Sequence, residues 1–340
     1  MADVTAAAPK KGGAGKIILV VILLLIGYGI YKAAGNATPK TPDDVVARAA
    51  SSMSEVKTAE FAGSLTTNIE GSKNPLTSLT GAAADANEPV SFSVGITGVS
   101  EFGNWEHPKS SIKITLTSVL FPNNGSAELE LRTIDADKFL KLNSAPVLGS
   151  LNLSSITNMW VKIGTQPVAG AVAPTTPSTT MTDAQADKVK RIIRGSRILR
   201  VTEDMGEEDI AGIKTHHYRV EVDEAETMRV SREISEVVND KTPSIEDEQK
   251  MTEFWARTEI KNGHVWVGVS DYYIYRTSFD AVVTKTDTEP SSGALSLDLR
   301  LRNFNKPVTV DVPTGTKSME ELMLQLFMSG GAKLPTGMMK

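Results

Sequence analysis

The chain has 340 residues, of which 40% are hydrophobic and 23% are charged. This is enough for one large domain or two ordinary ones, and it excludes a chain that is disordered throughout. A net charge of -5 without a basic stripe excludes a surface built to bind nucleic acid. The lack of cysteine excludes disulfides, thiolate metal sites, a cysteine nucleophile and a lipid-modified cysteine.

A hydrophobic run near the N-terminus predicts a transmembrane anchor over residues 17–34. Three lysines precede the run Ile17–Tyr31, and Lys32 ends it. A helix of this length rises about 22 Å, short of the roughly 30 Å hydrocarbon core, but flanking lysines can snorkel to the headgroups. The positive-inside rule then places a tail of residues 1–16 in the cytoplasm and the body of the chain outside it.

A cleavable signal peptide is the alternative interpretation of the same run. The positive flank, the length of the run and the small residues at 33–37 all fit one. Tyr28, Tyr31 and Lys32 make a poor cleavage region, which favours an anchor that is retained. Residues 35–40 are then a linker, and the body lies in the periplasm or at the cell surface.

A helix followed by a strand opens the body of the chain. Thr41 has the position of an N-cap, and Pro42 and two acidic residues follow it in the first turn. Phe61, Leu65 and Ile69 then alternate with polar residues, which predicts a strand. Apolar residues predict five further strands, at 92–96, 112–116, 127–131, 139–142 and 159–163.

The middle of the chain changes character twice. Residues 165–182 are rich in Pro, Thr, Ala and Gly, which predicts a solvated, flexible loop. An amphipathic helix is expected at 183–193. A hairpin follows, with its strands at 198–202 and 210–222 and an acidic turn at 203–209. Two helical stretches within 224–255 interrupt the strands and are typical of an inserted cover.

The C-terminal third shows the strictest alternation. Every odd position from Leu295 to Leu301 is leucine, and every position between them is polar. Residues 273–283 repeat this pattern. A shift of the strand pairing by one residue would expose each set of apolar side chains to water, so the register is fixed. We expect an antiparallel sheet with one apolar face. A final amphipathic helix at 319–327 is expected to lie on the core, before a tail of residues 331–340.

No residue pattern predicts catalysis, a cofactor or a bound metal. His216 and His217 are neighbours on a strand and point to opposite faces, so they cannot bind one metal together. Asp135 and Asp137 lack the spacing of a calcium loop and are expected to shape a turn. The sequence has no nucleophile elbow, phosphate-binding loop or dinucleotide fingerprint. We therefore expect a protein that is not an enzyme.

Several phrases of the sequence resemble a family of lipid-handling proteins. They are the hairpin Ala211-Gly212-Ile213-Lys214-Thr215-His216-His217-Tyr218-Arg219-Val220, the run Val265-Trp266-Val267 leading to Asp271, Tyr273 and Arg276, and the tail 304–313. With the order of elements, they resemble the LolA/LolB-type lipoprotein carriers and the mycobacterial LppX/LprG lipoproteins, whose second group has a similar tail strand.

This resemblance covers roughly residues 41 to 330. It implies a half-closed antiparallel barrel with helices over its concave face, enclosing an apolar cavity that takes acyl chains. The chain departs from the family in two respects, because it lacks the lipobox cysteine and its helical pair at 224–255 is longer.

The sequence therefore predicts an α+β domain at 41–330, a curved antiparallel sheet or open half-barrel with helices over the concave face, preceded by one transmembrane helix. The predicted function is to hold or transfer a lipid or lipoprotein acyl chain outside the cytoplasm, tethered to the membrane by the N-terminal helix. The alternative is an envelope interaction or sensor module that has a filled core and a protein partner. The residues expected to line the cavity alternate inward along the strands: Phe61, Leu65, Phe92, Val94, Ile112, Ile114, Leu129, Leu131, Tyr273, Tyr275, Phe279, Leu297 and Leu299.

Overall fold

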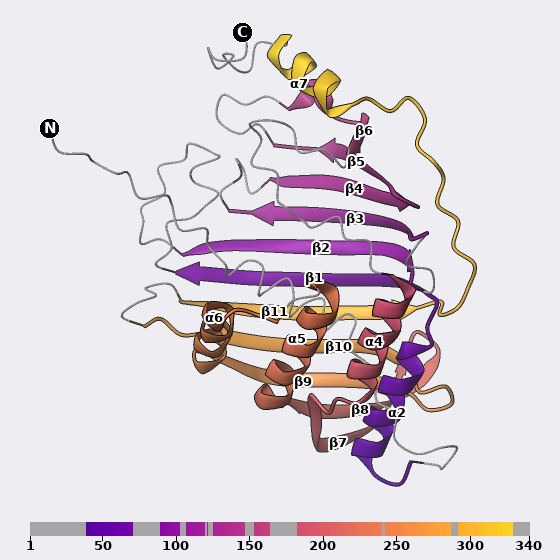
Figure 1. The fold of residues 1–340 in the computed structure, drawn as a ribbon, viewed down its shortest axis with the longest axis vertical. Coiled ribbons are helices and arrows are strands. Elements are labelled where there is room, and N and C mark those ends of the chain that lie inside the picture. Colours follow the sequence, from indigo (N-terminus) through magenta and orange to yellow (C-terminus); the bar gives the residue numbers. More distant parts are fainter. Residues whose placement is uncertain are drawn as a thin grey trace, which may run out of the picture.

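An antiparallel sheet of eleven strands forms the body of the protein. The computed structural model describes residues 39–70, 89–102, 107–119, 121, 125–146, 153–163, 182–239, 242–286 and 292–328. The strands are β1 (Thr58–Glu70), β2 (Val90–Glu101), β3 (Lys109–Ser118), β4 (Ser126–Ile134), β5 (Asp137–Ser144), β6 (Trp160–Ile163), β7 (Leu199–Ile210), β8 (Ile213–Val222), β9 (Thr258–Gly268), β10 (Ile274–Val283) and β11 (Ser292–Arg302). Their order across the sheet is β6-β5-β4-β3-β2-β1-β11-β10-β9-β8-β7 (Figure 1). The predicted antiparallel sheet is confirmed.

The first strand lies in the middle of the sheet, between the second and the last. β1 pairs with β2 on one side and with β11 on the other, in an unbroken register from Glu60 opposite Arg302 to Glu70 opposite Ser292. Arg302 Nε donates to Glu60 Oε2 at 2.9 Å across this junction. Two runs of neighbouring strands, β1 to β6 and β7 to β11, therefore meet at one central pair.

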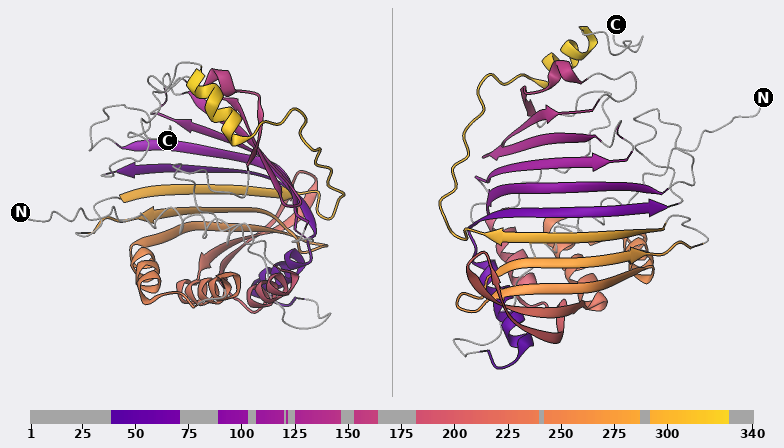
Figure 2. Two further views of the ribbon diagram at one scale, coloured as in Figure 1. Left: turned by 45° about the horizontal axis from the view of Figure 1, so that its top comes forward. Right: turned by 180° about the vertical axis from the view of Figure 1, so that it is seen from behind.

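Helices cover one face of the strands β7 to β11. They are α2 (Pro42–Ser54), α4 (Asp183–Arg194), α5 (Glu224–Asn239) and α6 (Ile245–Ala256), so the segment predicted as helical at 224–255 is α5 and α6. Figure 2 shows these helices gathered over one half of the curved sheet. Capping boxes at Thr41, Thr182 and Ser244 begin α2, α4 and α6.

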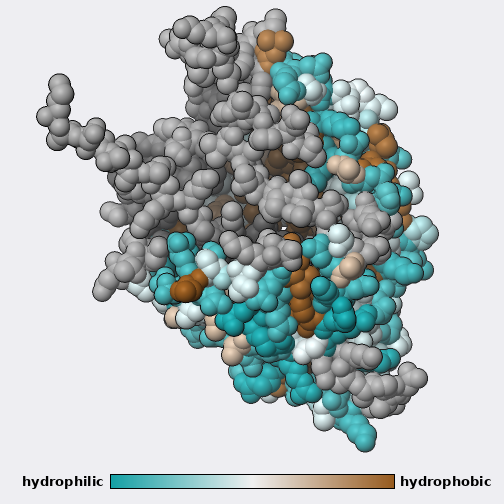
Figure 3. Space-filling model, in the orientation of Figure 1, coloured by the Kyte–Doolittle hydropathy of each residue, from teal (hydrophilic) through white to brown (hydrophobic). Residues whose placement is uncertain are grey.

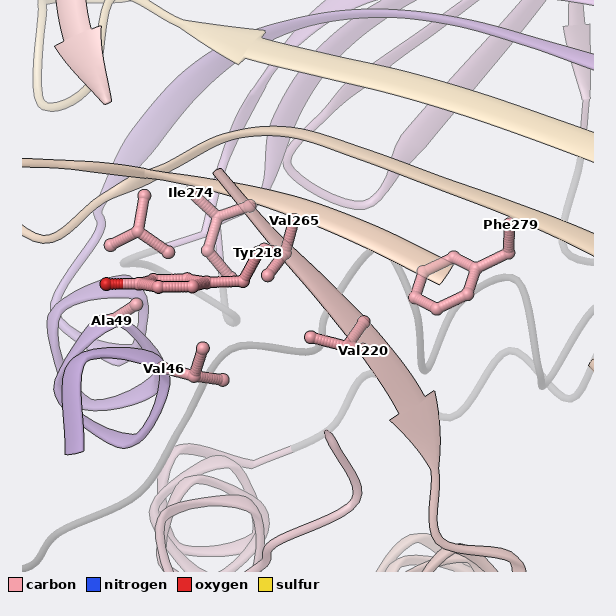
Figure 4. Close-up of a cluster of buried hydrophobic side chains, with 8 residues drawn as sticks. Val46, Ala49, Tyr218, Val220, Val265, Ile274 and Phe279 are labelled. Carbon is pink, nitrogen blue, oxygen red and sulfur yellow. The ribbon is translucent and has the colours of Figure 1, made fainter. Parts of the chain in front are cut away.

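The helix-covered side, called here the inner face, holds the core. Val46 and Ala49 on α2 lie against Tyr218, Val265 and other apolar residues of β8 to β10 (Figure 4). Ala49 and Val265 are fully buried. The small alanine lets the helix approach the sheet closely, so α2 fixes which side of these strands is the inside.

The acidic stretch 203–209 is not a turn, contrary to the prediction. It belongs to β7, and the hairpin turns at Ala211 and Gly212, which have φ angles of 53° and 85°. Positive φ at both central residues is the geometry of the two-residue hairpin turns that match strand twist. β7 forms an edge of the sheet, where exposed charges and the two bulges of its pairing with β8 oppose pairing with another molecule.

The tail strand that the family resemblance implies at 304–313 is absent. This segment is an extended connection without a strand, and it runs from β11 past the strand ends toward β6 (Figure 1). Its two prolines have no N–H group to offer a ladder. Side chains of the sheet hold its carbonyls instead: Thr58 Oγ1 donates to Lys306 O at 2.6 Å, and Arg132 Nη1 donates to Asp311 O at 2.9 Å.

The opposite edge of the sheet is covered by the end of this segment. The backbone N–H of Lys162 donates to Lys317 O at 2.9 Å, and the backbone N–H of Lys317 donates to Trp160 O, also at 2.9 Å. These bonds add a parallel bridge to β6. The helix α7 (Met319–Met328) follows, and its Gln325 Nε2 donates to Ser155 O at 2.8 Å. α7 therefore lies at the β6 end of the sheet, as Figure 2 shows.

Three predicted segments lie outside the described residues. They are the anchor at 17–34, most of the loop at 165–182 and the tail at 331–340. Within the described ranges, no helix combines the length and the apolar character needed to cross a membrane.

Candidate functional site

The inner face carries three rows of apolar residues across five neighbouring strands. Side chains directly opposite each other in an antiparallel pair share a face, so the registers define these rows. Across β11, β1, β2, β3 and β4 they read Leu301-Phe61-Gly98-Ile112-Leu131, Leu299-Gly63-Ile96-Ile114-Leu129 and Leu297-Leu65-Val94-Leu116-Ala127. No residue in these rows has a charged side chain or a side chain that can form hydrogen bonds.

Most of the predicted lining residues come together on this face. Nine of them occupy the rows: Phe61, Leu65, Val94, Ile112, Ile114, Leu129, Leu131, Leu297 and Leu299. Phe92 lies next to Val94 along the same face, opposite Thr67, and Phe279 extends the face onto β10 opposite Leu297. Strand alternation therefore identified one continuous surface.

Burial divides this surface into two regions. In the helix-covered half, Phe279, Leu297 and Leu299 are 4%, 6% and 1% exposed, and Phe279 belongs to the core cluster with α2. The lining residues on β1 to β4 are half-buried: Phe61, Leu65, Phe92, Val94, Ile112, Ile114, Leu129 and Leu131. Figure 3 shows apolar side chains, in brown, between the mostly polar surfaces of the helices. The half-buried region is the candidate binding surface.

The two predicted tyrosines lie at the end of the sheet. Tyr273 precedes β10, its hydroxyl accepts a hydrogen bond from Asn305 Nδ2 at 3.0 Å, and its ring is 4.6 Å from that of Phe304. Tyr275 is buried at the first bulge of β10, and its hydroxyl donates to Asp271 Oδ2 at 2.7 Å. Burial, and then this hydrogen bond, raises the pKa of Tyr275. Both rings therefore lie at the start of β10 and are not part of the half-buried lining on β1 to β4.

Polar side chains alternate with the apolar rows and point to the other side of the sheet, called here the outer face. Ser64 and Thr66 on β1 are exposed on either side of the half-buried Leu65. Asp135, predicted to shape a turn, sits in the β4–β5 turn with a φ angle of 55°. Within the described residues, no group of three or more His, Asp or Glu side chains has the arrangement of a metal site.

Three of the four histidines of the chain are found where β8 and β9 meet. His216 is on the inner side, where its ring stacks on Tyr218 at 5.9 Å. His217 points to the outer face and lies 2.9 Å from His264 of β9, measured from Nε2 to Nδ1. The sequence predicted the opposite faces of His216 and His217, but not the contact with His264, which comes from a strand far along the chain.

The comparison with solved structures finds a lipoprotein. A crystal structure of the Mycobacterium tuberculosis lipoprotein LppX is similar to this chain, with a TM-score of 0.34 and 13% sequence identity over 79% of this chain and 97% of that one. LppX is one of the lipoproteins that the sequence phrases resemble. No family model and no curated protein matches the chain.

Proposed function

We propose that this protein holds or transfers a lipid or lipoprotein acyl chain on its inner face, tethered to a membrane and working outside the cytoplasm. The observation that carries the proposal is the set of three uncharged, apolar rows on β11 and β1 to β4, whose β1 to β4 lining is half-buried. Removing apolar surface from water is favourable, and a face without charged groups adds no desolvation cost when an acyl chain covers it.

Burial alone supplies the binding energy in this proposal, and no bond is made or broken. One C16 chain offers at most about 12 kcal/mol at about 0.8 kcal/mol per CH₂ group. Ordering the chain and competition from the membrane remove much of this, so net affinity is modest. A modest affinity suits a protein that releases its ligand as well as binding it.

The tether and the location come from the N-terminal sequence. The hydrophobic run Ile17–Tyr31 follows three lysines, which supports an anchor with the body of the chain on the far side of the membrane. An anchored binder keeps its apolar face close to the lipid source, which offsets a modest affinity through high local concentration.

The test compares two neighbouring residues of β3 that point in opposite directions. Ile114 is in the middle apolar row, and Thr115 faces outward opposite Gly95. Ile114→Asp places a charge where the acyl chain lies, whereas Thr115→Asp places the same charge on the outer face. Each protein is purified without detergent, its lipids are extracted and measured by mass spectrometry, and its melting temperature is recorded.

Wild-type protein and Thr115→Asp are expected to carry lipid, and Ile114→Asp is expected to fold and carry at least about ten-fold less, the effect of losing roughly 1.4 kcal/mol. Equal lipid in both variants contradicts the proposal. Wild-type protein without lipid, together with an Ile114→Asp variant that does not fold, indicates a filled core and leaves the interaction module in its place.

A further inference from the structure

The outer face of β7 to β9 holds a connected group of polar rings and a carboxylate that lipid binding does not use. His217 Nε2 lies 2.9 Å from His264 Nδ1, and His217 Nδ1 lies 3.3 Å from Glu208 Oε2. Trp266 Nε1 donates to the same glutamate oxygen at 2.6 Å. The contacts join β7 through Glu208, β8 through His217 and β9 through His264 and Trp266.

The direction of each hydrogen bond follows from the glutamate. A carboxylate oxygen only accepts, so the 3.3 Å contact of His217 Nδ1 with Glu208 Oε2 favours the tautomer that has its hydrogen on Nδ1. His217 Nε2 then carries a lone pair, and it accepts a hydrogen bond from the N–H of His264 Nδ1. Both imidazoles are neutral in this arrangement, and each has a single tautomer that satisfies its neighbour.

The surroundings favour the neutral pair. The His217 ring stacks on Trp266 at 4.2 Å, and its side chain is 16% exposed. Arg276 Cζ of β10 lies over the Trp266 ring, 4.4 Å from its centroid, and Arg276 is paired with Asp298 of β11. Burial, and then the charge of a protonated His264, lowers the pKa of His217.

Further charges face His264 from the neighbouring strands. Burial, and then Arg219 and Arg276, lowers its pKa, while Asp280 of β10 and Glu203 of β7 act in the opposite direction. Arg219 is itself paired with Glu203 at 2.9 Å. The cations thus oppose a second positive charge at this place, although carboxylates are also near.

The pair also lies at a short ladder of the sheet. β8 is paired with β7 along its full length, from Ile213 to Val222, but with β9 only from Thr215 to Val220. The β7–β8 hairpin is therefore held to the sheet by a short ladder and by its inner-face contacts with α2. On the outer face, the contact of His217 with His264 and the hydrogen bond from Trp266 to Glu208 add to these.

We propose that His217 and His264 form a proton-sensitive hinge between the β7–β8 hairpin and β9. Protonation of His264 at Nε2 leaves the hydrogen bond intact, because Nδ1 still donates. Protonation of His217 at Nε2 removes the lone pair that accepts this bond and sets two N–H groups against each other. His217 then stays with Glu208 as an ion pair, and the hairpin loosens from β9 as a unit on acidification.

Hydrogen exchange of the full chain tests the hinge. Amides at 215–220 and 263–268 are followed at pH 7.5 and 5.0, with intrinsic rates corrected, and the β2–β3 ladder serves as internal reference. Protection of the β8–β9 amides is expected to fall by roughly ten-fold or more at the lower pH, the factor that one pKa unit produces. The reference ladder is expected to keep its protection.

Two variants separate the hinge from general acid sensitivity. His217→Gln and His264→Asn replace titrating rings by amides that still hydrogen-bond, so the extra loss at pH 5.0 is expected to disappear in each; if one does not fold, the other is used. His107→Asn, at an exposed ring beside Asp135, is the control and should behave as wild type. Equal protection at both pH values in wild type, or an unchanged loss in the folded variants, overturns the proposal. So does a ¹⁵N spectrum that places the His217 hydrogen on Nε2 at pH 7.5.

Discussion

The ring of Phe61 on β1 lies over Gly98, its partner on β2. A Cβ atom at residue 98 would be 2.9 Å from Phe61 Cζ and would also collide with the carbonyl oxygen of Ser111 on β3. The glycine therefore provides the space that the aromatic ring fills. Phe61 is one of the half-buried lining residues, so this close approach shapes the candidate binding surface.

Gly98→Ala should accordingly destabilise the fold. Either Phe61 or the β2–β3 backbone must move, and overpacking of this kind costs about 1–3 kcal/mol. Gly95→Ala on the same strand is the matched control, because the nearest atom to its added Cβ is 3.7 Å away, an ordinary contact. Chemical unfolding of both variants checks the difference. Equal free energies of unfolding would contradict the close packing of Phe61.

Leu299 should behave as a core residue. It is 1% exposed, so Leu299→Ala removes a fully buried side chain and is expected to cost about 2–5 kcal/mol. Leu295→Ala, on the same face of β11 but half-buried, is expected to cost clearly less. The midpoint of guanidinium unfolding measures both. Similar small losses would show that Leu299 lines an open space and not the core.

Tyr218 predicts a loss of stability at alkaline pH. Burial, followed by the charge of Asp204, raises its pKa to about 12 from a usual value of 10.0. The folded state thus keeps a proton that the unfolded chain loses, so this contribution is complete below about pH 10 and is lost as pH rises through 12. Among the described residues none forms a hydrogen bond with its hydroxyl.

Tyr218→Phe is therefore expected to leave the melting temperature at pH 7 equal or slightly higher, and to reduce its fall between about pH 9 and 12. Part of the fall should remain, because burial also raises the pKa of Tyr275. Melting curves over this range check the prediction, and an alkaline profile identical to that of the wild type would contradict it.

The N-terminal run gives a prediction about topology. If residues 17–34 are a retained anchor, the protein stays with membranes after an alkaline wash, and protease added to intact spheroplasts digests the chain beyond Lys40. N-terminal sequencing that begins near Thr38 would show cleavage and a soluble shuttle. If the body of the chain resists the protease while a cytoplasmic marker also stays intact, the predicted topology is wrong.

Strand alternation predicted which residues share the apolar face because alternation is a local property. From Leu295 to Leu301 the period of two residues fixes which side chains share a face, whatever strand lies beside them. The acidic part of β7 could not be recognised as a strand in this way. At an exposed edge both faces of a strand tolerate charged side chains, so the alternation disappears. Its turn at Ala211 and Gly212 was the better signal.

Relationships between distant strands could not be predicted in the same way. The contact of His217 with His264 depends on the β8–β9 register, and that register adjoins a bulged pairing of β9 with β10. Nothing within a short window of sequence encodes such a register. The strand implied at 304–313 is absent for a different reason. The apolar residues of this segment suit a strand, but its prolines lack the N–H donors that a ladder needs.

The pairing of β1 with β11 has a consequence for how the chain folds. Glu60 and Arg302 are 242 residues apart, so the central ladder cannot form until nearly the whole chain has been made. Loop closure over such a distance is slow, and until it happens β1 presents an unpaired edge. A chain that stops before β11 would keep that edge permanently and would be prone to aggregation. The central ladder is therefore completed only after β11 has been synthesised.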